Sequence, residues 1–248
     1  MVAFNDKILE VRANKFRRER GIGNENAIDF EKLLRTLDVL TYFRPLKGEF
    51  SGMALKTKSS CFMLVNTNQS MGRQHFTIGH ELYHLFIQDN FSFQMCNVGK
   101  FDKKDREEYN ADVFSSYLLL PEAGIIKQIP EEELAWGGEI SLATIVKLEQ
   151  YFGVSRTALL IRLHKLGLLR SDYSHFQKNI RKSAVEHGYS TALYDITDKP
   201  PIVIGNYGSK AKELFDKDKI SESHYHSLMF DIRIDVDSPN MDEDGKEI

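Results

Sequence analysis

The hydrophobic positions of the chain show two spacings, one typical of helices and one of strands. Over residues 74–88 the apolar side chains recur three or four positions apart, as on one face of a helix. Residues 105–120 repeat this pattern, with Asp105 as the expected N-cap and Pro121 as the stop. Further helices are predicted at 6–20, 30–37, 142–152, 156–166, 208–217 and 221–230.

Three short β-prone runs lie between the helices predicted at 30–37 and 74–88. They cover residues 39–43, 53–55 and 61–65, and turn material that includes Gly48 and Gly52 separates them. This arrangement predicts a small antiparallel sheet and therefore an α+β fold. Residues 122–140 carry no clear period and are expected to form a loop.

The composition is that of an ordinary globular protein. Of 248 residues, 42% are hydrophobic and 28% charged, with a net charge of −3, which excludes a collagen-like or largely disordered chain. The two cysteines, Cys61 and Cys96, are too few for a disulfide scaffold and are expected to be reduced thiols. No signal peptide or membrane-spanning run is found, so we expect a cytoplasmic protein without membrane contact.

The strongest chemical signal is His80-Glu81-Leu82-Tyr83-His84, an H-E-x-x-H motif within a predicted helix. A four-residue step places His80 and His84 on one face, where both imidazoles can bind one zinc ion. Glu81 projects beside the metal and can take a proton from water bound there. The alternative is a chance match in which both histidines are half-exposed on an ordinary helix.

The next predicted helix offers the other groups that a zinc hydrolase needs. Glu108 and Asp112 are four residues apart and share one helix face. Glu108 is the expected third metal ligand, and Asp112 can accept a hydrogen bond from an imidazole and fix its tautomer. The alternative is a solvated acidic helix start, because Asp102, Asp105 and Glu107 are close by.

Two segments together resemble the ImmA/IrrE-like metallopeptidases. The run from Arg73 to Phe86, RQHFTIGHELYHLF, is similar to the active-site helix of that family, commonly R-x-R-F-T-x-A-H-E-L-G-H. The run from Glu108 to Pro121 resembles its E-x-E-A-N-x-F-A-x-x-L-L-M-P helix, and residues 63–66 resemble the preceding strand. The similarity is strong over residues 25–125 and looser to residue 170.

The resemblance implies a zincin-like fold and a zinc-dependent protease of bacterial or phage origin. Members of the family often cleave a helix-turn-helix repressor or another regulator encoded nearby. Mapped onto this chain, the implied ligands are His80, His84 and Glu108, with Glu81 as the catalytic base.

Four departures from the family pattern lie within or directly beside the two motifs. Asp112 replaces Asn and keeps the same hydrogen-bonding role, while Tyr83 replaces Gly and bears on substrate scope more than on chemistry. The other two departures are Gly79 for Ala and Asn110 for Glu. A second electrophile normally stabilises the oxyanion, and the sequence does not choose among its candidates. These candidates are Tyr83, Tyr109, Tyr117, His164 and His175.

Residues 142–167 resemble a helix-turn-helix. Between residues 141 and 182 there are eight Lys or Arg against two acidic residues, a local charge of +6 that would suit phosphate contact. The favoured interpretation is a helical hairpin packed on the catalytic domain. Its core would comprise Leu142, Ile145, Leu148, Leu159 and Leu163.

The sequence therefore predicts a zincin-like metallopeptidase domain at 1–135, a helical hairpin at 136–170 and a C-terminal extension with an acidic tail at 171–248. The expected function is that of a zinc endopeptidase, with one Zn²⁺ per chain, that cleaves a repressor or antitoxin-like regulator. One alternative is a DNA-associated regulatory or toxin–antitoxin component with a structural or sensory metal site. Another is a partner-binding module without catalysis; the intact Glu81 favours the enzyme, because a structural site needs no general base.

Overall fold

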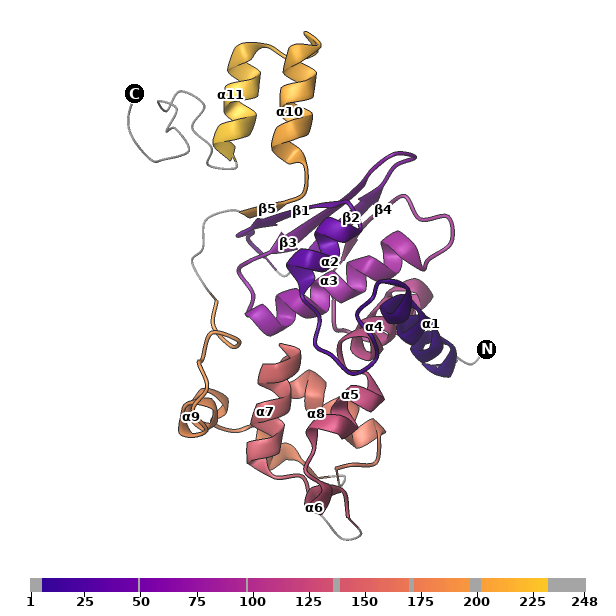
Figure 1. The fold of residues 1–248 in the computed structure, drawn as a ribbon, viewed down its shortest axis with the longest axis vertical. Coiled ribbons are helices and arrows are strands. Elements are labelled where there is room, and N and C mark those ends of the chain that lie inside the picture. The colour runs from indigo at the N-terminus through magenta and orange to yellow at the C-terminus, as the bar shows by residue number, and fades with distance from the viewer. Residues whose placement is uncertain are drawn as a thin grey trace.

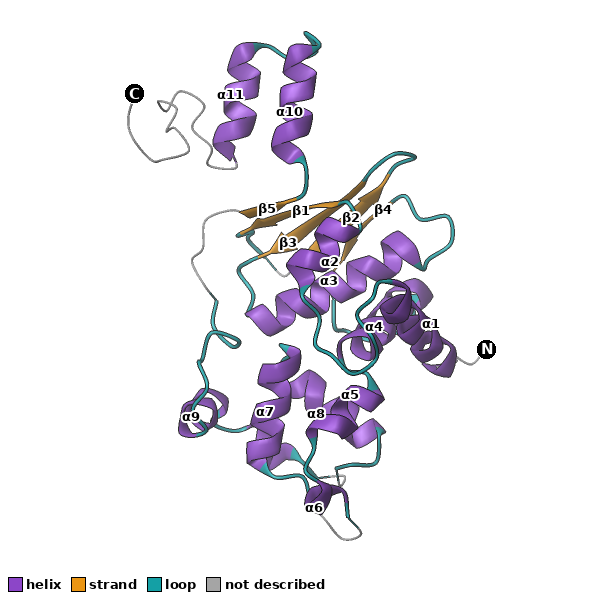
Figure 2. Ribbon diagram, viewed as in Figure 1, coloured by secondary structure: helices purple, strands orange, loops and turns teal. Residues whose placement is uncertain are grey.

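The computed structural model describes residues 6–48, 50–96, 98–135, 139–169, 172–196 and 202–231. A five-stranded sheet lies across the middle of the molecule, with the helices of the first half on one side and a C-terminal helix pair on the other (Figure 1). The first half of the chain contains both helices and strands, whereas the second half is almost entirely helical (Figure 2). The predicted α+β class is confirmed.

The sheet is mixed and has the strand order β4-β2-β3-β1-β5. Strands β1 (Val39–Arg44), β2 (Gly52–Lys56) and β3 (Cys61–Asn66) match the three predicted runs. Strands β4 (Phe93–Cys96) and β5 (Ile202–Ile204) form the two edges and were not predicted from the sequence.

The prediction of an antiparallel sheet is wrong for one pair of strands. The β2–β3 pair is an antiparallel hairpin, but β1 lies on the opposite edge of β3 and runs parallel to it. The parallel register aligns Thr41 with Met63, and the hairpin aligns Ala54 with Met63. All three side chains are fully buried, so this order places one continuous row of buried residues across the sheet.

The order of the strands in the sequence therefore does not determine how they pair in the sheet. The helices, by contrast, lie close to their predicted positions. Helix α1 spans Asp6–Glu19, and α2 spans Phe30–Thr36 with the predicted cap Asp29, whose side chain accepts from Lys32 N. Helix α4 (Arg106–Leu119) begins after the predicted cap Asp105. Helix α3 (Met71–Phe86) begins three residues before the predicted segment.

The predicted loop at 122–140 is wrong, because this stretch contains two short helices. They are α5 (Glu122–Gln128) and α6 (Glu131–Leu134), each beginning directly after a proline. Proline suits such a position because it lacks the N–H that the first turn would leave unpaired. Residues 136–138 of the predicted loop lie outside the described residues.

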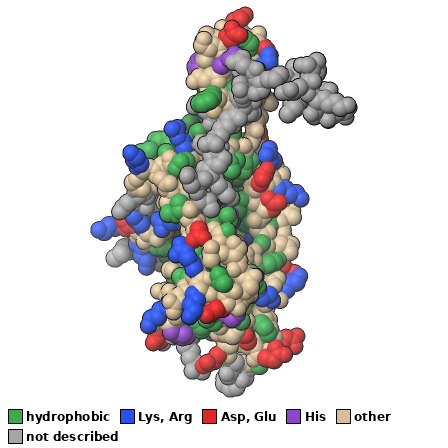
Figure 3. Space-filling model, turned by 90° about the vertical axis from the view of Figure 1, so that its left-hand side faces the viewer, with side chains coloured by type: hydrophobic (Ala, Val, Ile, Leu, Met, Phe, Trp, Pro, Cys, Tyr) green, Lys and Arg blue, Asp and Glu red, His purple; other side chains and the backbone are tan. Residues whose placement is uncertain are grey.

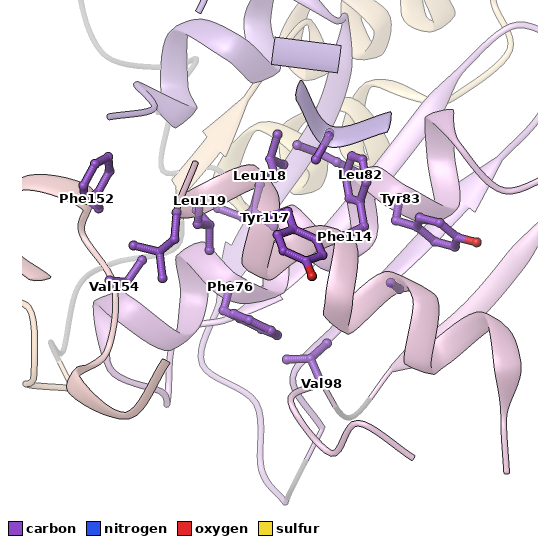
Figure 4. Packing of buried hydrophobic residues seen from close by; sticks show 14 of the residues in the cluster. Phe76, Leu82, Tyr83, Val98, Phe114, Tyr117, Leu118, Leu119, Phe152 and Val154 are labelled. Carbon is purple, nitrogen blue, oxygen red and sulfur yellow. The ribbon is translucent and has the colours of Figure 1, made fainter. Parts of the chain in front are cut away.

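Helices α7 (Leu142–Phe152) and α8 (Arg156–Lys165) form the predicted hairpin. Gly153 ends α7 with φ of 64°, and Ser155 caps α8. Phe152 and Val154, at this turn, lie beside Leu119 of α4 (Figure 4). The hairpin therefore shares the core of the first half of the chain. Its predicted core residues Ile145, Leu148, Leu159 and Leu163 are all buried, whereas Leu142 is half-buried.

The chain after the hairpin adds elements to both ends of the molecule. A 3-10 helix (Ser174–Gln177) and α9 (Ile180–Glu186), neither predicted, lead towards β5, which pairs antiparallel with β1. Helices α10 (Tyr207–Asp216) and α11 (Glu222–Asp231) form a pair that projects from the sheet (Figure 1). The acidic tail lies almost wholly outside the described residues. No helix in the described ranges is long and apolar enough to cross a membrane.

Helices α3 and α4 come into close contact at Gly79. A methyl group added there would lie 2.5 Å from Ser115 Oγ, and that hydroxyl donates to the Phe76 carbonyl at 2.8 Å. The absence of a side chain at Gly79 therefore allows a hydrogen bond to join the two helices. The same contact sets the distance between the helix faces that carry the candidate site.

Gly79→Ala is expected to destabilise the protein by about 1–3 kcal/mol, because the methyl group displaces the Ser115 hydroxyl. In a Ser115→Ala background the 2.5 Å collision with the hydroxyl is gone and only contacts of 3.3–3.4 Å with residue 115 remain. The same change is therefore expected to cost at least about 1 kcal/mol less there, helped by the higher helix propensity of Ala. Urea unfolding of the four proteins measures this coupling. Equal effects of Gly79→Ala in both backgrounds would contradict the proposed contact.

Candidate metal centre

Helix α3 carries His80, Glu81 and His84 on the side that faces the protein interior. All three side chains are fully buried, and the apolar neighbours Ile78, Leu82 and Leu85 fix the helix against the core. The two imidazoles lie one turn apart, with their Nε2 atoms separated by 3.1 Å. The predicted helix geometry of the H-E-x-x-H motif is therefore present, and the alternative of half-exposed histidines is wrong.

Two further donors approach these imidazoles from other elements. From α4, Glu108 places Oε2 3.4 Å from His80 Nε2 and Oε1 3.3 Å from His84 Nε2. From the end of β4, the Cys96 thiol lies 3.5 Å from Glu108 Oε1. The ligand atoms of His80, His84, Cys96 and Glu108 all lie within 4.8 Å of one another.

Asp112 holds the His80 ring from the side opposite the cluster. Its Oδ1 accepts a hydrogen bond from His80 Nδ1 at 2.9 Å, as expected from the sequence. The same carboxylate accepts from the backbone N–H groups of Gly99 and Phe101, each at 2.8 Å. Asp112 therefore joins α3, α4 and the loop after β4, and leaves His80 Nε2 free to face the cluster.

His84 has supporting neighbours that sequence reasoning did not identify. Its Nδ1 donates to Gln88 Oε1 at 2.5 Å, and its ring stacks on Phe91 with centroids 5.2 Å apart. The four-residue spacing between His84 and Gln88 could have predicted this contact, because residues four apart lie on the same side of a helix. Cys96 carried no such signal, because its short strand has no recognisable pattern in the sequence.

Glu81 is buried beside the cluster, and its Oε1 has no hydrogen-bond partner. Burial raises the pKa of this carboxyl group to about 7, although the nearby His80 and His84 act in the opposite direction. Gly52 of β2 makes room for the side chain, since a Cβ there would lie 2.9 Å from Glu81 Oε1. The carboxylate is thus confined, and its pKa suits proton transfer near neutral pH.

The charges of the other site residues depend on one another. Burial alone lowers the pKa of His80, but hydrogen bonds to Asp112 and Glu108 outweigh it and raise the pKa to about 9. Burial alone raises the pKa of Glu108, but hydrogen bonds from His80 and His84 hold it well below its ordinary value. Burial, with the carboxylates of Glu81 and Glu108, raises the pKa of the Cys96 thiol.

This arrangement fits a divalent metal ion. Nitrogen, oxygen and sulfur donors converge at separations of 3.1–3.5 Å, and an unpartnered carboxylate oxygen lies beside them. Two buried imidazoles facing each other at Nε2 would otherwise need a proton between them. A metal ion held by the same atoms would remove that requirement.

The five candidates for oxyanion stabilisation have partners elsewhere. The buried Tyr83 hydroxyl donates to Glu107 at 2.7 Å, so its bulk lies in the core between α3 and α4. Tyr109 donates to Asp6, and the Tyr117 ring lies under the Arg162 guanidinium. The rings of His164 and His175 contact Tyr173 and Phe176, respectively.

A cavity of about 350 Å³ lies next to the loop after β4 and does not include the histidines. Its walls come from the start of α3, from α4, from the start of α8 and from the loop. Arg73 borders it and donates to the Val98 carbonyl at 3.0 Å. The chemistry therefore lies with the buried cluster, and the cavity is a separate feature that shares the loop with Asp112.

Comparison with known proteins agrees with this geometry. Residues 34–164, over half of the chain, match the family described as the IrrE N-terminal-like domain. The chain belongs to this family. Metallopeptidase ImmA of Bacillus subtilis (strain 168) is 29% identical over 111 residues, which cover 42% of this chain and 65% of that protein. The resemblance seen in the sequence and the zincin-like α+β fold that it implied are both confirmed.

The metal-free protein is expected to lose stability as the pH rises from about 6.5 to about 9. The pKa of His80 is about 9 in the folded chain, against about 6.5 for an unperturbed histidine, so its protonated form favours folding. The protonated His80 contributes its full share of the free energy of unfolding below pH about 6.5, and this share is lost as the pH rises through about 9. We expect the free energy of unfolding to fall by on the order of 2 kcal/mol. Urea unfolding in chelator at several pH values measures it.

Asp112→Asn is the comparison for this pH dependence. It removes one of the three carboxylate charges that raise the pKa of His80, beside those of Glu108 and Glu81, so the fall in stability should become shallower. Stability that rises over the same pH range in the unsubstituted protein would show that His80 is not protonated as described.

Proposed function

We propose that this protein is a zinc metalloendopeptidase that hydrolyses a peptide bond in a protein regulator. The observation that carries the proposal is Glu81: a fully buried carboxylate with an unpartnered oxygen, adjacent to three converging ligands. A buried unpaired carboxylate is costly, and a structural metal site has no need for it. The match to metallopeptidase ImmA supports the same activity.

The proposed metal ligands are His80, His84 and Glu108, with one Zn²⁺ per chain. Imidazole nitrogen and carboxylate oxygen in a tetrahedral arrangement favour zinc, whereas Ca²⁺ and Mg²⁺ favour sites made of oxygen alone. When bound, zinc supplies a Lewis acid that polarises the scissile carbonyl and lowers the pKa of water from about 15.7 to about 7.

The chain's own residues handle the proton and the orientation of the ligands. Glu81, with a pKa of about 7, accepts the proton of the attacking water and then delivers it to the leaving amine. Asp112 and Gln88 hold His80 and His84 through their Nδ1 atoms, so both Nε2 atoms stay directed at the cluster. Each of the two imidazoles thus has one fixed tautomer.

The sheet edge next to the cluster supports an extended protein substrate. Strand β4 is an edge strand, and Phe93 and Met95 on it are exposed. An extended peptide can add to such an edge through main-chain hydrogen bonds, with side-chain pockets providing specificity. A peptide bound there would run past Cys96 and hence past the metal ligands.

The proposed substrate is a helix-turn-helix repressor or an antitoxin encoded near this protein's gene. This step rests on the family resemblance. It would place the protein in the cytoplasm, where such regulators act.

The structure favours the enzyme over the DNA-associated alternative. Most basic side chains between residues 141 and 182 are used in ion pairs within the chain: Arg156–Glu149, Arg162–Glu10, Lys165–Asp6, Arg181–Asp195 and Lys182–Glu186. Acidic and basic side chains are also interspersed on the face drawn in Figure 3. Phosphate contact would require these cations to exchange their partners.

The division into domains is also part of the proposal. The family match ends at residue 164, within the proposed hairpin at 136–170. We assign the metallopeptidase domain to residues 1–135, the hairpin packed on it to 136–170, and the C-terminal extension to 171–248. The extension lies beyond the matched residues, and it contributes none of the side chains proposed for the cluster.

Glu81→Gln is expected to leave the fold and zinc content unchanged and to slow cleavage at least about 100-fold, because general acid–base help is worth about 10²–10⁴-fold. Gln is nearly isosteric, so lost packing does not explain the result. The measurement is cleavage of purified repressors and antitoxins encoded nearby, followed by gel and mass spectrometry. Cleavage by the Gln variant at the native rate would mean that another group moves the proton.

Glu108→Ala is expected to lower zinc affinity about 10-fold or more, since one of three ligands is removed. Glu107→Ala is the matched control: it lies on the same turn of α4, but its carboxylate accepts from the Tyr83 hydroxyl. Zinc content after dialysis against graded chelator compares the two variants. Full zinc retention by the Glu108 variant would refute its assignment as a ligand.

A further inference from the structure

Cys96 is directed into the metal cluster by the alternation of β4. Phe93 and Met95 of this strand are 53% and 64% exposed, whereas Cys96 is 2% exposed. The strand is fixed at this point, because Ser51 N donates to the Cys96 carbonyl at 3.1 Å and Gly52 is paired with Cys96 in the sheet. The inward direction of the thiol is therefore set by the sheet and not by a freely moving loop.

The separations within the cluster agree with four ligands on one ion. Zinc binds nitrogen, oxygen and sulfur at about 2.0–2.3 Å, so neighbouring ligand atoms of a tetrahedral site lie about 3.3–3.8 Å apart. The Cys96 sulfur lies 3.5 Å from Glu108 Oε1, and Glu108 lies 3.3 Å and 3.4 Å from the two imidazole Nε2 atoms. The Cys96 sulfur thus meets this spacing towards Glu108, and it lies within 4.8 Å of the ligand atoms of His80 and His84.

A second observation places a polar group against the same thiol. The Glu81 carboxylate reaches Cys96 through Oε2, at 3.7 Å from the sulfur, while its Oε1 is buried and unpartnered. A cysteine that acted only as a small apolar residue would be expected among apolar neighbours. Here it lies between two carboxylates and beside two imidazoles.

We propose that Cys96 is a fourth metal ligand, which closes the site in a resting form of the enzyme. A zinc site with four protein ligands is closed, whereas a catalytic zinc site keeps one position open. Cys96 must therefore leave the ion before hydrolysis can begin. This inference rests on the proposed function, because a resting form has meaning only for an enzyme.

The movement that this release requires involves a short segment with two connections to the site. Strand β4 brings Cys96 to the cluster, and Gly99 and Phe101, directly after it, donate to Asp112, which holds His80. Displacement of this segment would therefore withdraw the sulfur and alter the support of one imidazole together. Since β4 is an edge strand paired only with β2 among the described strands, its release breaks hydrogen bonds to one neighbouring strand only.

The test is the spectrum of the full-length protein loaded with Co²⁺ in place of Zn²⁺. A thiolate ligand gives an intense sulfur-to-cobalt charge-transfer band in the near ultraviolet, which nitrogen and oxygen ligands do not give. We expect this band in the unsubstituted protein and in Cys61→Ser, and its loss in Cys96→Ser. Cys61 is the matched control because it is the other cysteine, in β3, and is not part of the cluster. X-ray absorption of the zinc form should show one sulfur at about 2.3 Å.

If Cys96 closes the site in the resting form, then removing its thiol should change the rate of cleavage. Cys96→Ser, or Cys96→Ala if the serine variant does not fold, should bind zinc about 10-fold or more weakly and, at saturating zinc, cleave the regulator faster than the unsubstituted protein. Cobalt bound at one equivalent without the charge-transfer band would overturn the ligand assignment and leave the proposed function intact. The band in the unsubstituted protein, together with no cleavage by either the unsubstituted protein or the Cys96 variants, would instead refute the proposed function. A band with unchanged cleavage in those variants would overturn the resting form.

Discussion

The close packing of α3 on α4 is the constraint on which the site depends. His80, Glu81 and His84 lie on one helix, and Glu108 and Asp112 on the other, so the helix separation decides whether their side chains meet. At Gly79 the helices approach until only a hydroxyl group fits between them, and that hydroxyl links Ser115 to the Phe76 carbonyl. The packing of Gly79 against Ser115 thus sets the geometry of the charged cluster, which begins at the next residue, His80.

The centre itself concentrates charge in the protein interior. Three side chains of α3 and Asp112 of α4 are almost completely buried, so each of these groups has lost its contact with bulk water and depends on its neighbours in the cluster. The raised pKa values of His80 and Glu81 and the lowered pKa of Glu108 are consequences of this burial and proximity. A divalent cation would balance the carboxylates directly, so metal binding and the stability of the fold are expected to be linked.

Buried polar contacts hold the second half of the chain together, and a backbone hydrogen bond attaches it to the start of α3. Arg156 of α8 pairs with Glu149 of α7 at 2.5 Å, and both side chains are buried. Tyr194 donates to the same glutamate at 2.5 Å, and the Leu193 carbonyl accepts from Gly72 N at the start of α3. The stretch after α9 therefore reaches the helix that carries the histidines, although it lies beyond the family match.

The sequence by itself determined the features that depend on near neighbours in the chain. Helical spacing, the cap Asp105, the stop at Pro121 and the four-residue steps of His80–His84 and Glu108–Asp112 are local, so the helices and the faces of the site could be predicted. Caps and periodicity act within a few residues, whatever the rest of the fold does. The short helices after Pro121 and Pro130 were missed because their seven and four residues are too few to show a period.

Only the tertiary structure decided which distant segments meet. The parallel pairing of β1 with β3 follows from a shared buried face, and the edge strands β4 and β5 exist because a neighbouring strand offers them hydrogen-bond partners. For the same reason Cys96 could not be assigned from the sequence: its place beside Glu81 and Glu108 is set by the pairing of β4 with β2. Strand partners are chosen by burial across the whole sheet, which no local pattern encodes.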